Sequence, residues 1–214
     1  MKSTMAMTVA ILTWSAGEAM GRRPGNTGNA SGVPVRVYYN FDRSVTMDIS
    51  LLSGARMRAS LILAQAGIRL EWRLGKPAED EMGAQVLGIR FVPSVPPALR
   101  TGTDTQALAA ARPYGKGTTI TVFDNRVAAY LVPIGSPDRA NVLGHVLAHE
   151  IVHVLEGVAR HSATGLMTAR WTWRELREIT RNGLTLAEED RRLLRIRFAS
   201  AVAVVAAATE GISR

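Results

Sequence analysis

The chain of 214 residues contains no cysteine. This absence excludes disulfide bonds, thiolate metal sites, a cysteine nucleophile and any latency switch that depends on a thiol. Lysine is scarce as well, since only Lys2, Lys76 and Lys116 are present, and the net charge of +8 comes mostly from arginine. The basic residues form no run with interleaved aromatic side chains, so we expect no binding to nucleic acid.

Apolar stretches long enough to cross a bilayer are also missing, because a spanning helix needs about 20 apolar residues. The apolar stretches near the two ends of the chain, residues 5–14 and 198–208, are shorter. The first follows Lys2 and precedes the small residues Ala16 and Ala19, which resembles a signal peptide, with a buried strand as the alternative. We therefore expect a secreted or periplasmic protein without stable membrane insertion, and a cytoplasmic location as the alternative.

The domain organisation follows from composition and periodicity. Residues 21–34, GRRPGNTGNASGVP, are typical of a linker, so we expect a possible signal peptide and flexible linker over 1–33 and one folded domain over 34–214. Predicted strands cover 33–41, 68–74, 84–92 and 117–125, and predicted helices cover 47–66, 139–157, 171–180 and 185–208. This order predicts a mixed sheet with packed helices, of the α+β or α/β class.

Capping residues support the predicted ends of these helices. Gly67 follows the first helix at a position typical of a C-cap. Asp138 is a possible N-cap of the third helix, which we expect to begin near Arg139 or Asn141. A capping box is predicted at the start of the last helix, formed by Thr185 and Glu188.

All four histidines lie within residues 145–161, HVLAHEIVHVLEGVARH. On a helix, His149 and His153 lie about 40° apart around the axis and about 6 Å apart along it, so both imidazoles can bind one zinc ion. Glu150 lies one step around the helix, where its carboxylate can reach a water molecule at the metal without binding the metal. This H-E-x-x-H pattern is a specific signal when it lies on a predicted helix.

A catalytic zinc ion takes three protein ligands and leaves one position for water. Gly157 is suited to the left-handed turn that ends the helix, and His161, four residues later, is the natural third ligand. His145 shares the face of His149, but three histidines at this spacing span about 12 Å, which is too far for bonds of about 2 Å. We therefore expect His145 to be structural or to support a ligand, and Glu156 to be a weaker candidate ligand than His161.

The segment HEIVHVLEGVARHSATGLM resembles the metzincin zinc peptidases, whose signature is H-E-x-x-H-x-x-G-x-x-H followed by a methionine turn. Its portion HSATGLM looks most like the matrixin branch. The resemblance implies one catalytic zinc ion (Zn²⁺) and the following roles: His149, His153 and His161 as its ligands, Glu150 as the general base, Gly157 as the turn glycine, and Met167 as the methionine beneath the metal. Met167 as a flexible core residue is the alternative.

The resemblance also implies a fold. It consists of a twisted mixed sheet with a backing helix and an active-site helix over 34–157, then a small, mostly helical lower subdomain over 158–214. The strand at 117–125 would border the substrate cleft. The chain departs from the signature, because three residues instead of two lie on each side of Gly157. We hypothesise that the extra residue in the turn compensates for the extra helical residue, which rotates the helix exit by about 100°.

These residues predict a zinc-dependent endopeptidase whose substrate is a peptide or protein. A catalytically silent, zinc-stabilised binding module is one alternative, and it would need a fourth protein ligand. Another H-E-x-x-H hydrolase is the second, including one with a gluzincin-type third ligand at Glu175 or Glu178. Trp171 and Trp173 are interpreted either as walls of a substrate pocket or as packing anchors.

Overall fold

The computed structural model describes residues 32–78, 85–100, 106–112 and 119–197. The predicted leader, most of the predicted linker and residues 198–208 of the predicted last helix lie outside these ranges. The described elements are β1 Val33–Phe41, α1 Ile49–Ala64, β2 Ile68–Leu74, β3 Val86–Val92, α2 Pro97–Arg100, β4 Ala109–Arg112, β5 Thr119–Phe123, α3 Asp124–Leu131, α4 Ser136–Glu156 and α5 Trp173–Arg181. Residues 188–197 are also helical. None of the helices in the described ranges has the length and apolar character needed to cross a membrane.

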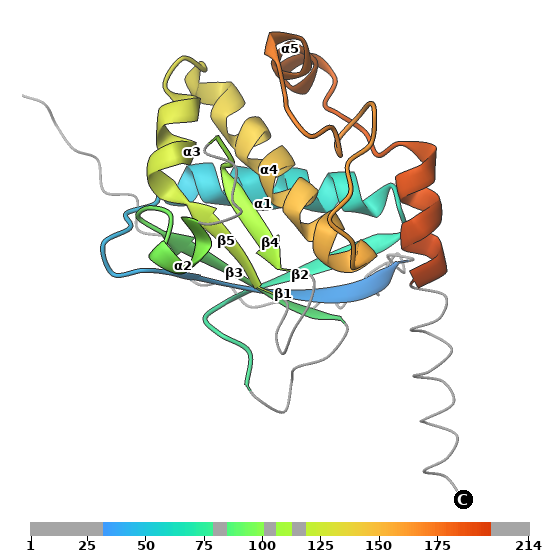
Figure 1. Cartoon of the computed structure of the whole chain (residues 1–214), viewed down its shortest axis with the longest axis horizontal. Helices are drawn as coiled ribbons and strands as arrows, with labels where there is room; N and C mark the ends of the chain where they lie inside the picture. Colours follow the sequence, from blue (N-terminus) through green and yellow to red (C-terminus); the bar gives the residue numbers. More distant parts are fainter. Residues whose placement is uncertain (1–31, 79–84, 101–105, 113–118, 198–214) are drawn as a thin grey trace, which may run out of the picture. The chain divides into compact units, whose positions relative to one another are not determined.

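The strands form one five-stranded sheet in the order β2-β1-β3-β5-β4 (Figure 1). β1, β2, β3 and β5 run parallel to one another, whereas β4 runs antiparallel to β5. The prediction of a mixed sheet with packed helices is therefore confirmed. Side chains that alternate along the strands supply one apolar face, which consists mainly of Val35, Val37, Ile68, Leu70, Leu87, Ile89, Phe91, Ile120 and Val122.

The edge of the sheet at β4 differs from the expectation. We expected the strand at 117–125 to border the substrate cleft, but β5, Thr119–Phe123, lies inside the sheet between β3 and β4. The edge strand is β4, whose sequence AAAR carries few residues that favour strands. The chain forms this strand because Ala109–Arg112 pairs with Thr119–Val122, an interaction that alternating hydrophobicity does not reveal.

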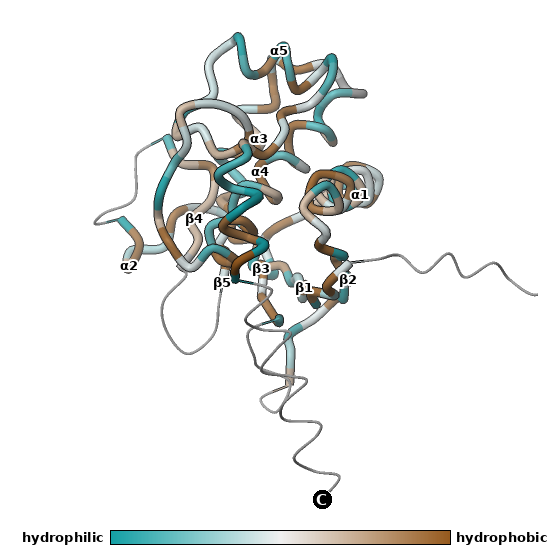
Figure 2. Tube along the Cα trace, turned by 90° about the vertical axis from the view of Figure 1, so that its right-hand side faces the viewer, coloured by the Kyte–Doolittle hydropathy of each residue, from teal (hydrophilic) through white to brown (hydrophobic). Residues whose placement is uncertain are grey.

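Two long helices cover the apolar face of the sheet. α1 lies against β2, and α4 lies against β4 and β5, with α1 and α4 packed on each other (Figures 1 and 2). A methyl group on Gly144 of α4 would lie 2.6 Å from Cβ of Arg58 and 2.8 Å from the carbonyl oxygen of Ala55. Both residues belong to α1, so glycine at this position allows α4 to pack closely against α1.

The observed ends of the histidine helix agree only in part with the ends predicted from the sequence. The prediction that the histidine helix ends at Gly157 is confirmed, but α4 begins at Ser136, with Gly135 as its N-cap and Asp138 inside its first turn. The predicted N-cap role of Asp138 is therefore wrong, because Pro137 already starts the helix at a position where proline is favourable.

The predicted capping box at the last helix is also wrong. Helical structure begins at residue 188 in place of 185 or 186, and the side chain of Glu188 accepts hydrogen bonds from Arg191 and Arg195. Asp190 caps this helix, since its carboxylate accepts the backbone N–H of Ala187 at 3.1 Å. The capping box that does form belongs to α5 and pairs Thr172 with Glu175.

Candidate metal centre

Three histidines converge at the end of α4. His149 and His153 lie on one face of that helix, with their Nε2 atoms 3.1 Å apart. His161 follows the helix, and its ring centroid lies 5.4 Å from that of His149 and 4.9 Å from that of His153. One ligand atom from each ring lies within 4.8 Å of the others. The predicted convergence is therefore confirmed, and the three side chains are close enough to bind one metal ion.

The turn after α4 brings the third histidine back toward the helix. Gly157 adopts a left-handed conformation with φ of 67°, and its N–H bonds to the carbonyl oxygens of His153 and Val154. A side chain at this position would be strained, and its Cβ would collide with the guanidinium of Arg197. The longer spacing on both sides of Gly157 is thus compatible with a shared site.

Backbone carbonyls orient two of the rings. Nδ1 of His149 donates to the carbonyl oxygen of Leu166 at 2.8 Å, and Nδ1 of His153 donates to that of Val158 at 3.3 Å. With both protons on Nδ1, the two Nε2 lone pairs face each other at 3.1 Å, which is unfavourable unless a cation lies between them. Two nitrogens on one tetrahedral zinc ion lie about 3.4 Å apart, given bonds of about 2.0–2.1 Å. The donor set therefore fits a metal ion.

The three imidazoles are kept unprotonated, as metal ligands must be. Burial lowers the pKa of His149 and of His153 to about 4. Burial also lowers the pKa of His161, although this ring is the most exposed of the three. At neutral pH the lone pairs that face the centre are thus free to bind a cation.

The side chain of Glu150, on α4, is half-buried and points toward the edge strand β4. Its carboxylate accepts the backbone N–H of Ala111, and burial raises its pKa to about 7 in spite of this bond. Phe123 donates to the carbonyl oxygen of Leu108 at 2.9 Å. Because bonded pairs alternate in antiparallel strands, the peptide groups of Ala109 and Ala111 face away from β5. The carboxylate of Glu150 therefore lies on the side of β4 that faces away from β5, and Glu150 is next in sequence to His149.

His145 does not belong to the cluster, as expected for a structural residue. It is fully buried, Nδ1 donates to the carbonyl oxygen of Asn141 at 2.7 Å, and Nε2 accepts the backbone N–H of Leu184 at 2.9 Å. Both ring nitrogens are occupied, and burial lowers the pKa of this ring to about 4. His145 thus joins α4 to the segment that follows α5.

The three glutamates considered as ligands have other partners. Glu156 is buried and forms a salt bridge with Arg160, with 3.3 Å between Oε2 and Nε. Glu175 accepts both the backbone N–H and the hydroxyl of Thr172. Glu178 accepts the side-chain amide of Asn182. Within the described residues, none of these carboxylates belongs to a group that is spaced for a metal.

The segment that carries Met167 follows the third histidine directly. Ser162 and Thr168 form an isolated bridge, and the N–H of Ser162 donates to the carbonyl oxygen of Met167 at 2.8 Å. Met167 is 1% exposed and packs in the hydrophobic core, next in sequence to Leu166, whose carbonyl orients His149. This placement is compatible both with a support of the site and with a core residue.

The two tryptophans differ in position. The ring of Trp171 lies 5.9 Å from that of His149 and 6.3 Å from that of His145, edge to face in both cases. It therefore forms a wall beside the metal centre. Trp173 is 65% exposed at the start of α5, and it does not act as a packing anchor.

Sequence reasoning missed the polar network behind His161. Asp190 is completely buried, and its carboxylate binds both Arg160 and Ser162, which flank the third histidine. No spacing in the sequence signals these contacts, because Asp190 lies about thirty residues further along the chain.

Comparison of the chain with protein-family models and with curated proteins found no match.

Proposed function

We propose that this protein is a zinc-dependent endopeptidase with a metzincin-like arrangement. The observation that carries the proposal is the convergence of His149, His153 and His161, with Glu150 next in sequence to the first of them on α4. Three imidazoles without any thiolate suit zinc, and a site with three protein ligands leaves one position for water or substrate. A site that only stabilised the fold would be closed by a fourth protein ligand and would not need a glutamate next to one of its histidines.

The fold is compatible with this assignment. In the proposal, α1 is the backing helix and α4 the active-site helix of an upper subdomain over 34–157. The methionine turn, α5 and the helical segment at 188–197 belong to a lower subdomain that begins at 158. Gly157, at the boundary between them, provides the turn, and Met167 supports the centre from the core.

The reaction is the hydrolysis of a peptide bond. A zinc ion held by the three histidines would lower the pKa of a water molecule there toward about 7 and polarise the scissile carbonyl. Glu150 accepts a proton from the attacking water and then donates it to the nitrogen of the leaving amine, so the carboxylate is restored after each turnover. A group with a pKa near neutrality is suited to both transfers, which contribute about 10²- to 10⁴-fold to the rate.

The edge of the sheet supports a peptide as the substrate. The N–H of Ala111 is bonded to the carboxylate of Glu150, but the outward peptide group of Ala109 and the outward carbonyl oxygen of Ala111 lie on the same edge. An extended chain can add to such an edge through backbone hydrogen bonds. In this arrangement a peptide bond of the substrate passes the metal centre, and Trp171 lines one side of its path. Recognition through backbone hydrogen bonds does not require a particular substrate sequence. We therefore propose an endopeptidase and not an enzyme that is specific for one small molecule.

Zinc analysis combined with peptide cleavage tests the proposal. We expect one zinc per chain, cleavage within a library of unstructured peptides, loss of cleavage with a chelator, and its return with zinc. Glu150→Gln is the matched control, because it keeps the shape of the side chain and removes the base, and it should bind zinc without cleaving. Cleavage by the Glu150→Gln protein at the wild-type rate, or a chain that binds no zinc, would disprove the assignment.

A further inference from the structure

Of the three proposed ligands, His161 has the fewest contacts that hold its side chain in place. His149 and His153 are carried by α4, and each donates to a backbone carbonyl. The ring of His161 is exposed and makes no hydrogen bond within the described part of the chain. It follows four residues of turn and irregular backbone that begin at Gly157. Its position therefore depends on what holds the backbone on either side of it.

Both neighbours of His161 are bound to one carboxylate. Nη2 of Arg160 donates to Oδ1 of Asp190 at 2.6 Å, and the hydroxyl of Ser162 donates to the same oxygen at 2.6 Å. Nη1 of Arg160 also donates to the hydroxyl of Ser162 at 3.1 Å, which closes a ring of contacts around the ligand. Asp190 is 0% exposed, so water does not compete for these bonds.

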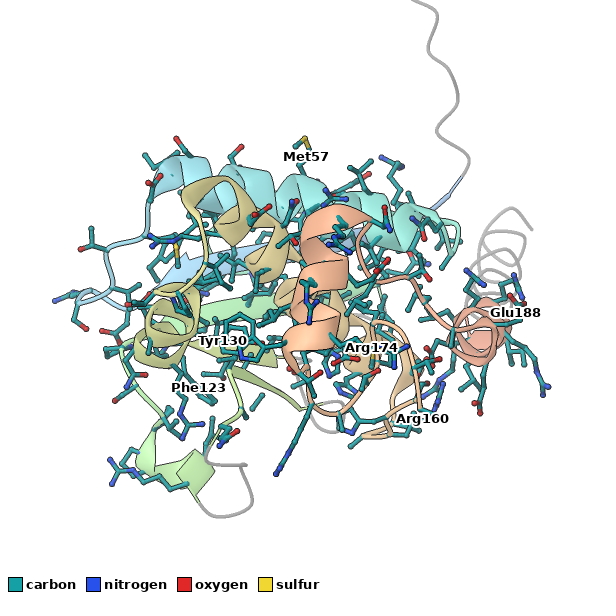
Figure 3. All side chains as sticks on the ribbon, turned by 90° about the horizontal axis from the view of Figure 1, so that it is seen from above. Met57, Phe123, Tyr130, Arg160, Arg174 and Glu188 are labelled. Carbon is teal, nitrogen blue, oxygen red and sulfur yellow. The ribbon has the colours of Figure 1, made fainter. Side chains whose placement is uncertain are left out.

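The carboxylate itself is held firmly. Oδ2 of Asp190 accepts the backbone N–H of Ala187, which fixes the side chain at the start of the helical segment at 188–197. The guanidinium of Arg160 continues to the buried carboxylate of Glu156, in the last turn of α4, at 3.3 Å. In Figure 3, Arg160 lies on the side of the domain that carries the helix with Glu188. The network thus connects the end of α4, the segment with His161 and the last described helix.

We propose that Asp190 is a positioning residue that sets His161 for the metal ion, acting through Arg160 on one side and Ser162 on the other. The inference rests on the proposed function, because it requires that His161 binds zinc. Groups that orient metal ligands typically change metal affinity by about 10- to 100-fold when they are removed. A ligand on an irregular segment gains most from such support, since three residues separate it from Gly157 and no helix fixes its angle.

A purely structural role for Asp190 makes a different prediction. In that case its loss lowers the stability of the fold, and its effect on zinc affinity is small or independent of His161. If Asp190 acts by positioning the ligand, its effect on zinc affinity disappears once the imidazole of His161 is gone. A double-mutant cycle separates the two cases.

The experiment measures zinc dissociation constants of the full 214-residue chain by competition with a chelator, and thermal unfolding of each metal-free protein. The variants are Asp190→Asn, His161→Ala and the two combined. Glu188→Gln is the matched control, because it removes one charge from the same helix, and the salt bridges of Glu188 within the described ranges are to Arg191 and Arg195. We expect Asp190→Asn to weaken zinc binding about 10- to 100-fold, Glu188→Gln to leave it unchanged, and the double variant to bind no more weakly than His161→Ala.

Other outcomes overturn the inference. Wild-type affinity in Asp190→Asn, or a double variant whose loss is the product of the two single losses, removes the positioning role while His161 stays a ligand. If His161→Ala binds zinc as the wild type does, the proposed three-histidine site fails and the positioning role fails with it. Should Asp190→Asn not fold, Ser162→Ala replaces it in the same cycle, because it removes one of the two links, and it should weaken zinc binding several-fold only when His161 is present.

Discussion

A substitution of His145 distinguishes residues that bind the metal from residues that stabilise the fold. It lies one helical turn before His149, but both of its nitrogens are engaged, with Asn141 and Leu184. His145→Leu keeps a side chain of similar volume and removes both hydrogen bonds. The carbonyl oxygen of Asn141 remains in the helix, whereas the buried N–H of Leu184 loses its acceptor.

The cost follows from these two contacts. A buried donor without an acceptor costs about 1–3 kcal/mol, and the lost bond to Asn141 contributes about 0.5–1.5 kcal/mol. We therefore expect His145→Leu to reduce the free energy of unfolding by about 1.5–4.5 kcal/mol, which lowers Tm by roughly 3–18 °C. His145→Gln is the control, because its amide oxygen can still accept from Leu184, and it should lose less.

The dependence on pH gives an independent check on the metal-free protein. In the folded chain, burial lowers the pKa of His145 from 6.5 to about 4. The unfolded chain therefore takes up a proton first as the pH falls, and stability that is present above pH 6.5 is lost between pH 6.5 and 4. One such group contributes at most about 3 kcal/mol, and His145→Leu should lose this part of the pH dependence.

Urea unfolding from pH 4 to 8, with zinc titration of the folded variants, measures these effects. The reasoning is refuted if His145→Leu unfolds as the wild type does, or if it weakens zinc binding as strongly as His161→Ala while its stability is unchanged.

Further predictions concern the site and its support. Glu150→Gln should retain zinc and lose about 10²- to 10⁴-fold in kcat/KM, because the base is removed; peptide cleavage and zinc titration check this, and unchanged kinetics would exclude the role. Gly157→Ala should reduce stability by more than about 1 kcal/mol and weaken zinc binding, since a side chain is strained at φ of 67°; urea unfolding measures the first effect, and a gain in stability would contradict it. Gly144→Ala, which usually stabilises a helix, should cost about 1–3 kcal/mol because the methyl group meets Arg58 at 2.6 Å; a higher Tm would show that α1 and α4 separate freely. Removal of zinc with a chelator should lower Tm, since zinc at a thousandfold excess over Kd stabilises the folded chain by about 4 kcal/mol, and a Tm that does not depend on zinc would argue against the site.

The parts of the site that lie on one helix were predictable from the sequence. The spacing of His149, Glu150 and His153 determines their relative positions once α4 forms, because helical geometry is local. The end of α4 was predictable as well, since Gly157 favours the left-handed turn that is observed.

Contacts between distant segments were not predictable. The strand Ala109–Arg112 consists mostly of alanine and exists because it pairs with β5. The predicted capping box of Thr185 and Glu188 does not form. The carbonyl oxygen of Thr185 accepts the N–H of Leu166, whereas in an N-cap residue it would accept an N–H of the helix. The bonds of Asp190 to the two neighbours of His161 likewise join residues about thirty positions apart in the sequence.

X-ray absorption at the zinc edge, on the zinc-loaded wild type and on His161→Ala, tests the central claim most directly. The account predicts three imidazole nitrogens and one non-protein oxygen at about 2.0–2.1 Å in the wild type, and one imidazole fewer in the variant. A spectrum with four protein ligands, or one that His161→Ala leaves unchanged, would contradict it.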